Sequence, residues 1–408
     1  MDLSDGLIDF CGSALPKWAH RPLVKQIFAE AKVLGGEARI VGGAVRDWIA
    51  GYPVGDIDMA VNLPIKTVAS YFSSIDVSVL ETGLQHGTIT LCCGGDAVEI
   101  TQTRVDLETD GRHAIVAYDN DWSRDAVRRD FTINAIYLDA DGMIFDPLGG
   151  RADLQAGRLR FAGDARQRVK EDALRIIRYC RFLPRFDRSG VDAEIINLLR
   201  DNSVLCADLS GERITRELRQ IMLGGQVAKV IGVMRKAQID RAALGIKFNL
   251  LPLGIDESFD MMLGQLGWLV GLATVMPAGS ARRLARRLRL SRAEDRCLAR
   301  LDAGISAEDL ELLGGPKWQQ GAYYLGSWAP MLYAVQSWRN LVAIDTRRCA
   351  ELSAWTPPKS PICGTDLLSH GVDNGVAIGH MLSEAEKRWV ESNFTLKKSA
   401  LLKWLLGN

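Results

Sequence analysis

V-G-G-A-V-R-D at 41–47, followed by G-D-I-D at 55–58, is the stretch of this 408-residue chain that decides its fold class. Alternate residues of a strand point to the same face, so Asp56 and Asp58 are predicted to project together while Ile57 enters the core. Two carboxylates this close need a cation between them, and Mg²⁺ prefers carboxylate and phosphate oxygens. Glycines before a helix let the backbone approach a polyphosphate. The pattern therefore predicts metal-assisted phosphoryl or nucleotidyl transfer, with a solvated turn as the alternative.

The composition is that of an ordinary globular protein, with 47% hydrophobic and 25% charged residues. Because 50 basic residues are balanced by 50 acidic ones, no overall positive charge indicates nucleic acid, and any RNA-binding surface must be a local patch. A chain of this length is expected to form roughly two to four domains.

Three features bear on the cellular location of the chain. Residues 1–5 are acidic and lack the basic and apolar runs of a secretory signal. The most apolar window, 261–276, is too short to span a membrane and is predicted to be a buried helix. The eight cysteines show no CxxC spacing, which is typical of free thiols in a reducing compartment. We therefore predict a cytoplasmic protein without membrane association, and no motif points to a protein partner.

Secondary-structure signals divide the chain into two parts. Short apolar runs between turn residues predict strands at 38–41, 57–61, 77–80, 88–92, 97–100, 133–138 and 143–145. From about residue 165 onward, helical periodicity predicts helices at 166–200, 212–223, 226–238, 281–300 and 380–407. The expected fold class is α+β, with an N-terminal α/β head built on a mixed sheet and a long all-α part behind it.

A third carboxylate and a phosphate cradle would complete a site around the paired aspartates. Glu99 lies between apolar neighbours on a predicted central strand whose outward face would carry the two aspartates, and a two-metal site needs such a ligand. The alternative is an ordinary exposed glutamate. Gly43 opens a predicted helix whose amide N–H groups suit phosphate, and Arg46 would add charge-assisted hydrogen bonds. The alternative there is a tight turn with a surface Arg46–Asp47 pair.

The octapeptide R-R-D-F-T-I-N-A at 128–135 joins charged residues to a predicted buried strand. A buried Asn134 needs hydrogen-bond partners, which a ribose or a neighbouring loop would supply. Arginines offer planar forks for phosphate. Taken alone, the octapeptide is equally well explained as a polar lead into a strand.

The stretch E-D-A-L-R-I-I-R-Y-C-R-F at 171–182 lies within a segment, 166–188, that holds eight basic and three acidic residues. A continuous helix would place four charged side chains on one polar face: Glu171, Asp172, Arg175 and Arg178. Such a face could present donors and acceptors to a base edge and select a nucleotide without a template. A set of i,i+4 salt bridges is the alternative.

Residues 280–300 contain eight arginines against Glu294 and Asp295. On a helix, Leu284 and Leu288 would face inward, and the arginines would form the outer face: Arg282, Arg283, Arg286, Arg287 and Arg289. This face is the best candidate for contact with an RNA backbone outside the head. A solvated helical face is an equally good interpretation of the pattern.

Together and in this order, the motifs resemble the class II CCA-adding enzymes (bacterial tRNA nucleotidyltransferases) and the related bacterial poly(A) polymerases. The resemblance covers nearly the whole chain and is weakest at 225–360. The matching segments are GGAVRDWIAG with GDIDMAV (42–61), HGTITL (86–91), VEITQTR (98–104), RRDFTINA (128–135), EDALRIIRYCRF (171–182), GERITREL (211–218) and the segment from CGTDLLSHG to FTLKKSALLKWL (363–405).

The resemblance implies four domains: a catalytic head at 22–149, a neck at 150–224 that recognises the base and binds RNA, a body at 225–360 and a tail at 361–408. It also implies Mg²⁺ as the cofactor and tRNA, ATP and CTP as the substrates. Residues 104–121 resemble the flexible loop that accompanies the switch from CTP to ATP in this family.

The resemblance also assigns roles residue by residue. The Mg²⁺ ligands would be Asp56 and Asp58. The triphosphate and ribose contacts would be Gly43, Arg46 and Arg129, with Asp130 beside them. The residues that hydrogen-bond the incoming C or A would be Glu171, Asp172 and Arg175, with Arg178 and Arg181 nearby.

Local features separate the activities of the family. Poly(A) polymerase relatives carry basic residues where this chain has G-L-Q-H-G at 83–87, and they often end in a basic tail, unlike 401–408 here. We therefore expect CCA addition, in which the tRNA 3′-hydroxyl attacks the α-phosphate and pyrophosphate leaves. Addition of A alone and poly(A) synthesis remain the alternatives. A catalytically silent RNA-binding relative is disfavoured because Asp56 and Asp58 are both present.

Overall fold

The computed structural model describes residues 15–407, with gaps at 76, 110–113, 119–120, 189, 251–266, 341, 343–344 and 373–374. The chain divides into two compact units, Met1–Ile214 with Val233–Ala243, and Thr215–Gly232 with Leu244–Asn408.

The first unit carries the sheets of the described chain. Its strands are β1 (Ala38–Val41), β2 (Asp58–Val61), β3 (Ser78–Gly83), β4 (Thr88–Cys93), β5 (Asp96–Gln102), β6 (Arg104–Thr109), β7 (Ala114–Tyr118), β8 (Tyr137–Leu138) and β9 (Ile144–Phe145). Seven of them form one sheet in the order β3-β4-β5-β2-β1-β8-β9. Only β2 and β5 pair in parallel, so the mixed sheet predicted from the sequence is confirmed.

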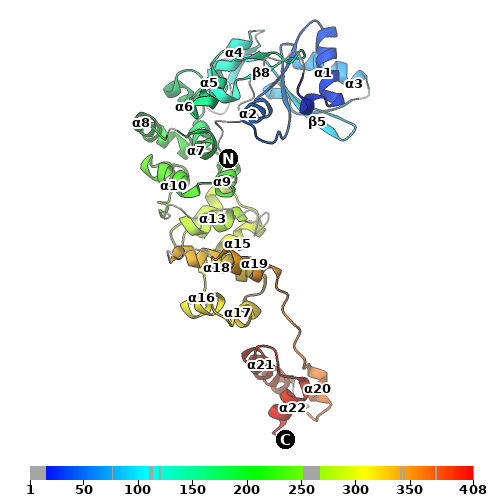
Figure 1. The fold of residues 1–408 in the computed structure, drawn as a ribbon, viewed down its shortest axis with the longest axis vertical. Helices are drawn as coiled ribbons and strands as arrows, with labels where there is room; N and C mark the ends of the chain where they lie inside the picture. The colour runs from blue at the N-terminus through cyan, green and yellow to red at the C-terminus, as the bar shows by residue number, and fades with distance from the viewer. Residues whose placement is uncertain are drawn as a thin grey trace. The chain divides into compact units, whose positions relative to one another are not determined.

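Some helices pack against strands of this sheet, and others continue the first unit. They are α1 (Pro22–Val33), α2 (Gly43–Ile49), α3 (Ile65–Ser74), α4 (Trp122–Val127), α5 (Gly150–Ala156), α6 (Ala165–Glu171), α7 (Leu174–Phe186) and α8 (Ala193–Asn202). Helices α1, α2 and α3 pack against strands of the large sheet, and α1 and α3 lie beside each other in Figure 1. The segment expected to be a flexible loop forms a separate hairpin of β6 and β7.

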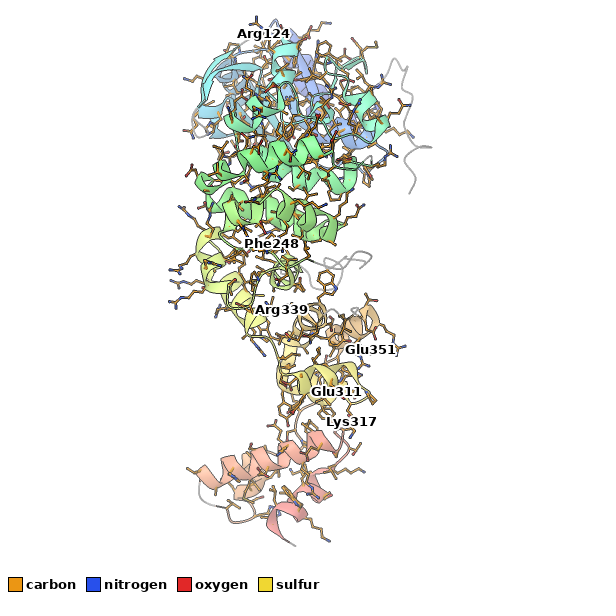
Figure 2. The ribbon with its side chains drawn as sticks, turned by 90° about the vertical axis from the view of Figure 1, so that its left-hand side faces the viewer. Arg124, Phe248, Glu311, Lys317, Arg339 and Glu351 are labelled. Atoms are coloured by element: carbon orange, nitrogen blue, oxygen red, sulfur yellow. The ribbon has the colours of Figure 1, made fainter. Side chains whose placement is uncertain are left out.

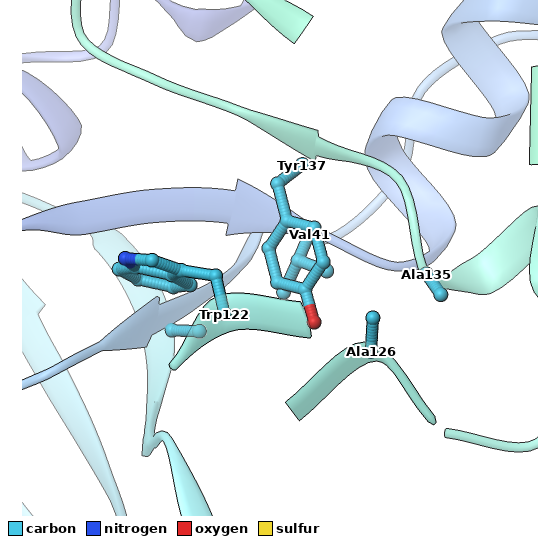
Figure 3. Packing of buried hydrophobic residues seen from close by; sticks show 6 residues of the cluster. Val41, Trp122, Ala126, Ala135 and Tyr137 are labelled. Carbon is cyan, nitrogen blue, oxygen red and sulfur yellow. The ribbon is translucent and has the colours of Figure 1, made fainter. Parts of the chain in front are cut away.

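A small aromatic core lies beneath the glycine turn that follows β1. Val41 at the end of β1, Ala60 of β2, Trp122 and Ala126 of α4, and the pair Ala135 and Tyr137 make up this cluster (Figure 3). The rings of Trp122 and Tyr137 meet edge to face, with centroids 5.6 Å apart. This packing fixes the position of α4 and of the segment after it relative to the two central strands.

The predicted strand at 133–138 is wrong in its first half. Thr132–Asn134 form a 3₁₀ turn, and strand β8 comprises only Tyr137–Leu138. The side chains explain the turn, because Thr132 donates a hydrogen bond to the buried Asp153 at 2.6 Å and Asn134 is bonded on both sides. Polar partners therefore override the apolar run at this point.

Three helices cross or border the division between the units: α9 (Gly211–Leu223), α10 (Val227–Lys236) and α11 (Ile239–Leu244). The second unit is otherwise made of α13 (Gly267–Val275), α14 (Ala281–Leu288), α15 (Arg292–Ala303), α16 (Ala307–Gly314), α17 (Trp318–Leu325), α18 (Ala329–Arg339), α19 (Thr346–Ala354), α20 (Gly364–Leu368), α21 (Gly375–Glu391) and α22 (Lys398–Leu406). This helical second part of the chain agrees with the sequence prediction.

Helix α13 packs against α15 and α18, and every one of its residues is buried. The predicted buried helix at 261–276 is thus confirmed for 267–275, while its beginning falls outside the described residues. Arg339 of α18 (Figure 2) donates hydrogen bonds to the carbonyl of Ala273 at 2.9 Å and to the Asp302 carboxylate at 3.2 Å. One arginine therefore joins the ends of three helices.

Within the described ranges, no helix is long and apolar enough to cross a membrane. The seven cysteines found there are all free thiols.

Candidate active site

The two carboxylates that the sequence placed on one face do flank a buried residue. Ile57 is 1% exposed, whereas Asp56 and Asp58 are both exposed. Only Asp58 belongs to β2, since that strand begins there. In the parallel pairing of β2 and β5, Asp58 lies directly opposite Glu99, which is also exposed. Asp58 and Glu99 therefore project from paired positions of neighbouring strands, and Asp56 lies two residues before Asp58, ahead of β2.

The glycine turn between β1 and α2 lies next to this carboxylate group. Gly42 has φ +79°, a conformation that L-residues with side chains rarely adopt. A Cβ atom at Gly42 would lie 3.8 Å from Oδ2 of Asp58. Gly43 is the first residue of α2, so the unpaired N–H groups of that helix begin beside the carboxylates.

The protein and the carboxylates around Asp58 raise its affinity for protons. Partial desolvation by surrounding protein, and then the negative charges of Glu99 and Asp56, raise the pKa of Asp58 to about 6, against the opposing effect of Arg129. A bound cation would relieve this repulsion. In the described part of the chain no three His, Cys, Asp or Glu side chains form a closed metal cluster. Two carboxylates with water and phosphate oxygens are nevertheless a usual Mg²⁺ ligand set, so Asp56 and Asp58 fit this ion.

Arg46 is a buried residue that joins α2 to α7. Its guanidinium donates hydrogen bonds to Asp47 at 2.8 Å and to Asn134 at 2.7 Å. It also lies 5.0 and 4.8 Å from the ring centroids of Phe182 and Phe186. The Arg46–Asp47 pair anticipated as an alternative exists, but the arginine is 8% exposed rather than on the surface.

The same network continues to Asp130. Asn134 donates to Oδ1 of Asp130 at 2.9 Å, and Arg178 of α7 donates two hydrogen bonds to Oδ2 at 2.9 and 2.5 Å. Burial favours the neutral acid, but the charge of Arg178 and these hydrogen bonds lower the pKa of Asp130 below its usual value. A buried Asn134 was expected to need hydrogen-bond partners, and in the structure these are Arg46 and Asp130.

Arg129 is held by a buried acid that the sequence interpretation did not single out. Asp125 of α4 is 0% exposed and accepts hydrogen bonds from Arg129 at 3.0 Å, Arg128 at 2.6 Å and Tyr137 at 2.7 Å. The i,i+3 and i,i+4 spacing in D-A-V-R-R was the available signal. The charge of Arg129 also reaches Asp58, whose pKa it lowers.

The predicted polar face at 171–182 is wrong, because the helix is interrupted. Helix α6 ends at Glu171, Asp172 is extended with φ −149° and ψ 102°, and α7 begins at Leu174. Asp172 accepts a hydrogen bond from the Leu174 N–H at 3.1 Å, which stabilises the start of α7. Arg178 consequently pairs with Asp130 rather than with the two acids before it.

Arg175 contacts the turn that contains Arg128, and Glu171 contacts Arg175. Arg175 donates to Glu171 at 3.1 Å and to the carbonyls of Arg168 and Arg128 at 2.7 and 2.9 Å. Arg168, 5% exposed, also bonds Glu171 and the Arg128 carbonyl. The structure therefore brings the motifs at 128–135 and 171–182 together. Arg175 and Arg168 both bond the Arg128 carbonyl, and the sequence gave no reason to select Arg168.

The remaining predicted residues are Arg181 of α7 and three arginines of α14. The Arg181 guanidinium lies 4.3 Å from the ring centroid of Phe182. In the second unit Arg282, Arg283 and Arg286 are exposed on α14, and Leu284 and Leu288 are buried as predicted. Arg289 follows α14 with φ 53°, so it is not on the helix.

Comparisons with known proteins identify the family. Residues 38–160 match the family described as the Poly A polymerase head domain. The human CCA tRNA nucleotidyltransferase 1, mitochondrial, is 31% identical over 385 residues, which are 90% of this chain and 86% of the relative. The CCA-adding enzyme of Geobacillus thermodenitrificans is 35% identical over 216 residues, 52% of each chain.

Solved structures agree on the fold. The CCA-adding enzyme of Bacillus stearothermophilus in complex with CTP has a TM-score of 0.68 and 23% identity, covering 94% of this chain and 96% of that one. The CCA-adding enzyme of Thermotoga maritima complexed with tRNA has a TM-score of 0.69 and 20% identity, covering 100% and 98%. By this similarity over 90% of its length to the human relative, the chain belongs to the CCA-adding tRNA nucleotidyltransferases of the tRNA nucleotidyltransferase/poly(A) polymerase family.

Proposed function

We propose that this chain adds CCA to the 3′ ends of tRNA from CTP and ATP, with release of pyrophosphate. The observation that carries the proposal is the register of Asp58 opposite Glu99, beside the Gly42 turn, in a member of this family. The relatives named above are CCA-adding enzymes, and two of them were solved with CTP or tRNA.

The chemistry follows from the charges around Asp58. The 3′-hydroxyl of the tRNA would attack the α-phosphate in line with the departing pyrophosphate. Asp56 and Asp58 would hold Mg²⁺, which when bound lowers the pKa of the attacking hydroxyl and neutralises charge on the phosphate. Glu99 would orient or complete this ligand set. Gly43, Arg46 and Arg129 would position the triphosphate and ribose, Arg129 directly and Arg46 through the network that includes Asp130.

The neck residues would select the base. Cytosine and adenine both present an exocyclic amino group, whereas uracil and guanine present a carbonyl oxygen at the same place. Asp172 is an acceptor that would favour the amino group, and Arg175 is a donor for a ring acceptor. Glu171 would keep Arg175 in place through their ion pair, and Arg178 and Arg181 lie nearby on α7.

Several further assignments are part of the proposal. We assign the head to 22–149, the neck to 150–224, the body to 225–360 and the tail to 361–408. The exposed Arg282, Arg283 and Arg286 would contact the RNA backbone. A cytoplasmic location stays a prediction, because the human relative is named a mitochondrial protein.

Incubation with defined tRNA transcripts tests the proposal. Transcripts that end before CCA, or after CC, are offered CTP alone, ATP alone and both, with Mg²⁺. Two C residues followed by one A and arrest are expected. Addition of A only to the CC-ended transcript would identify an A-adding enzyme. A long ladder of A would identify a poly(A) polymerase, an alternative favoured only by the description of the matched head domain.

The metal assignment predicts the effect of Asp58→Ala. Incorporation of both C and A is expected to fall by at least about 10²–10³-fold, because charge stabilisation at the phosphate is lost. Circular dichroism should show an unchanged fold, since Asp58 is exposed. Glu81→Ala, another exposed acid of the same sheet, is the control and should retain activity. Substantial residual activity of Asp58→Ala would contradict the assignment. Glu99→Gln measures whether the third carboxylate contributes.

A further inference from the structure

The carboxylate of Asp172 is held from two sides. One oxygen, Oδ1, accepts the N–H of Leu174 at 3.1 Å. The other, Oδ2, accepts a charge-assisted hydrogen bond from Arg213 of α9 at 2.7 Å. The two side chains are 29% and 37% exposed, so the pair remains open to a ligand from solvent. No role in the family resemblance or the comparisons is attached to Arg213 individually.

After these two hydrogen bonds, the carboxylate oxygens of Asp172 can still accept further hydrogen bonds. The two donors also fix the direction in which those oxygens point. An ionised carboxylate has about four lone-pair sites on its two oxygens, and here the protein uses one site on each. The backbone N–H alone would let the carboxylate turn about its side-chain torsion. Because Arg213 comes from a separate helix, 41 residues away, it fixes the second oxygen independently of α7.

The direction of the carboxylate decides which base it accepts. An oxygen aimed at the base attracts the amino group of cytosine or adenine and repels the carbonyl oxygen of uracil or guanine. A carboxylate that rotates away gives up both the attraction and the repulsion. Discrimination therefore depends on the orientation of Asp172 as much as on its presence.

We propose that Arg213 is a specificity-determining residue, which positions Asp172 so that the site accepts nucleoside triphosphates with an exocyclic amino group and rejects those with a carbonyl group there. The proposal rests on the proposed function, because it assumes that Asp172 reads the base. Arg213 acts through Asp172 and is a positioning residue.

The test compares Arg213→Met, Arg213→Lys and Arg216→Met with the unchanged protein. Methionine keeps the long stem of arginine without its charge, and lysine restores one charged donor. Arg216 is an exposed arginine of the same helix and serves as the matched control. For each protein, kcat/KM is measured for CTP against UTP on a transcript lacking CCA, and for ATP against GTP on a CC-ended transcript. Equilibrium binding of the four triphosphates is measured separately by calorimetry.

Arg213→Met is expected to lower the CTP:UTP and ATP:GTP ratios by about tenfold, the value of one charge-assisted hydrogen bond. Arg213→Lys should recover part of the ratio, and Arg216→Met should keep all of it. In an Asp172→Asn background, Arg213→Met should add little. Unchanged ratios in Arg213→Met, even with a lower melting temperature, would overturn the proposal and leave a purely structural ion pair.

The binding data separate this inference from the proposed function. If the unchanged protein adds nothing to tRNA but binds CTP and ATP in preference to UTP and GTP, and Arg213→Met loses that preference, only the proposed function fails. If the unchanged protein adds CCA but the variant keeps its selectivity, only the role of Arg213 fails.

Discussion

At the scale of single residues, Asp125 shows how a buried acid fixes two arginines of the candidate active site. It is 0% exposed and accepts hydrogen bonds from both arginines of the R-R-D motif and from Tyr137. Burial by itself disfavours the ionised acid, but Arg129 and Arg128 together lower the pKa of Asp125 to about 2. The side chain is therefore charged throughout the physiological range and stabilises the positive charge beside Asp58.

The substitution Asp125→Asn should destabilise the first unit. We expect the free energy of unfolding at pH 7 to fall by about 3 kcal/mol, because two partly buried guanidinium groups lose their counter-charge. Urea denaturation followed by circular dichroism measures this change. Asp141→Asn is the control, since Asp141 lies exposed in a turn and should change stability by less than about 0.5 kcal/mol. Equal stability of the Asp125 variant and the unchanged protein would contradict the account.

Lowering the pH should remove the contribution of the Asp125 charge to the free energy of unfolding of the unchanged protein. The pKa of Asp125 is about 2 in the folded state, and an unfolded aspartate has a pKa of about 3.9. A lowered folded pKa means that the stabilisation is complete above about pH 4 and is lost as the pH falls through 2. The difference in unfolding free energy between the unchanged protein and Asp125→Asn should narrow by about 2 kcal/mol over that interval. A constant difference from pH 5 to 2 would contradict the assignment.

The residues of the candidate site differ in how far the sequence could predict them. The placement of Asp56 and Asp58 on either side of a buried Ile57 was predicted from the two-residue period of a strand, which needs no long-range information, although β2 begins only at Asp58. The contact between Asp172 and Arg213 spans 41 positions and depends on how two helices pack. No local pattern encodes such a distance, so the sequence could indicate the acid but not its partner.

At the scale of elements, the three long helices predicted in the helical part are all interrupted, and 380–407 comprises the end of α21 and then α22. The segment 166–200 forms three helices, α6, α7 and α8, and 281–300 forms α14 and α15. Hydrophobic periodicity is assessed over a window of residues, so by itself it does not locate a break. Capping chemistry locates it instead, with Asp172 bonded to the start of α7 and Ser291 at the start of α15.

Ser291 forms a capping box that predicts a local effect of Ser291→Ala. Its hydroxyl accepts the Glu294 N–H at 3.3 Å, and the Glu294 carboxylate accepts the Ser291 N–H at 3.0 Å. Loss of the cap should cost about 1 kcal/mol and accelerate hydrogen exchange about fivefold in the first turn of α15. Mass spectrometry of exchange in 292–296 measures it. Ser280→Ala is the control, because Ser280 precedes α14 without a side-chain cap. Unchanged exchange in Ser291→Ala would show that the box is not needed.

At the scale of the whole molecule, a neutral chain must recognise a polyanion. The 50 basic and 50 acidic residues cancel, so long-range attraction of tRNA has to come from local surfaces. We propose helix α14 as one such surface, because Leu284 and Leu288 are buried while Arg282, Arg283 and Arg286 are exposed. The sequence predicted this arrangement because a strong helical period needs no tertiary information.

Replacing Arg282, Arg283 and Arg286 together by glutamine should weaken tRNA binding in a salt-dependent way. Each phosphate contact contributes about 0.9 to the slope of log K against log salt concentration for duplex nucleic acid. We therefore expect the slope to become shallower by about two to three, with affinity at low salt reduced most. Filter binding or fluorescence anisotropy over a salt series measures it.

The control removes the same number of charges elsewhere. Lys25 and Lys32 of α1 and Lys66 of α3 are exposed lysines on helices that pack against the sheet of the head. Their joint replacement by glutamine lowers the net charge equally, so it reproduces any effect of total charge alone. If both triple variants shift the slope equally, binding responds to overall charge and α14 is only a solvated face. If only the α14 variant does so, that helix contacts the phosphates, and the neutral composition conceals a directed RNA-binding surface.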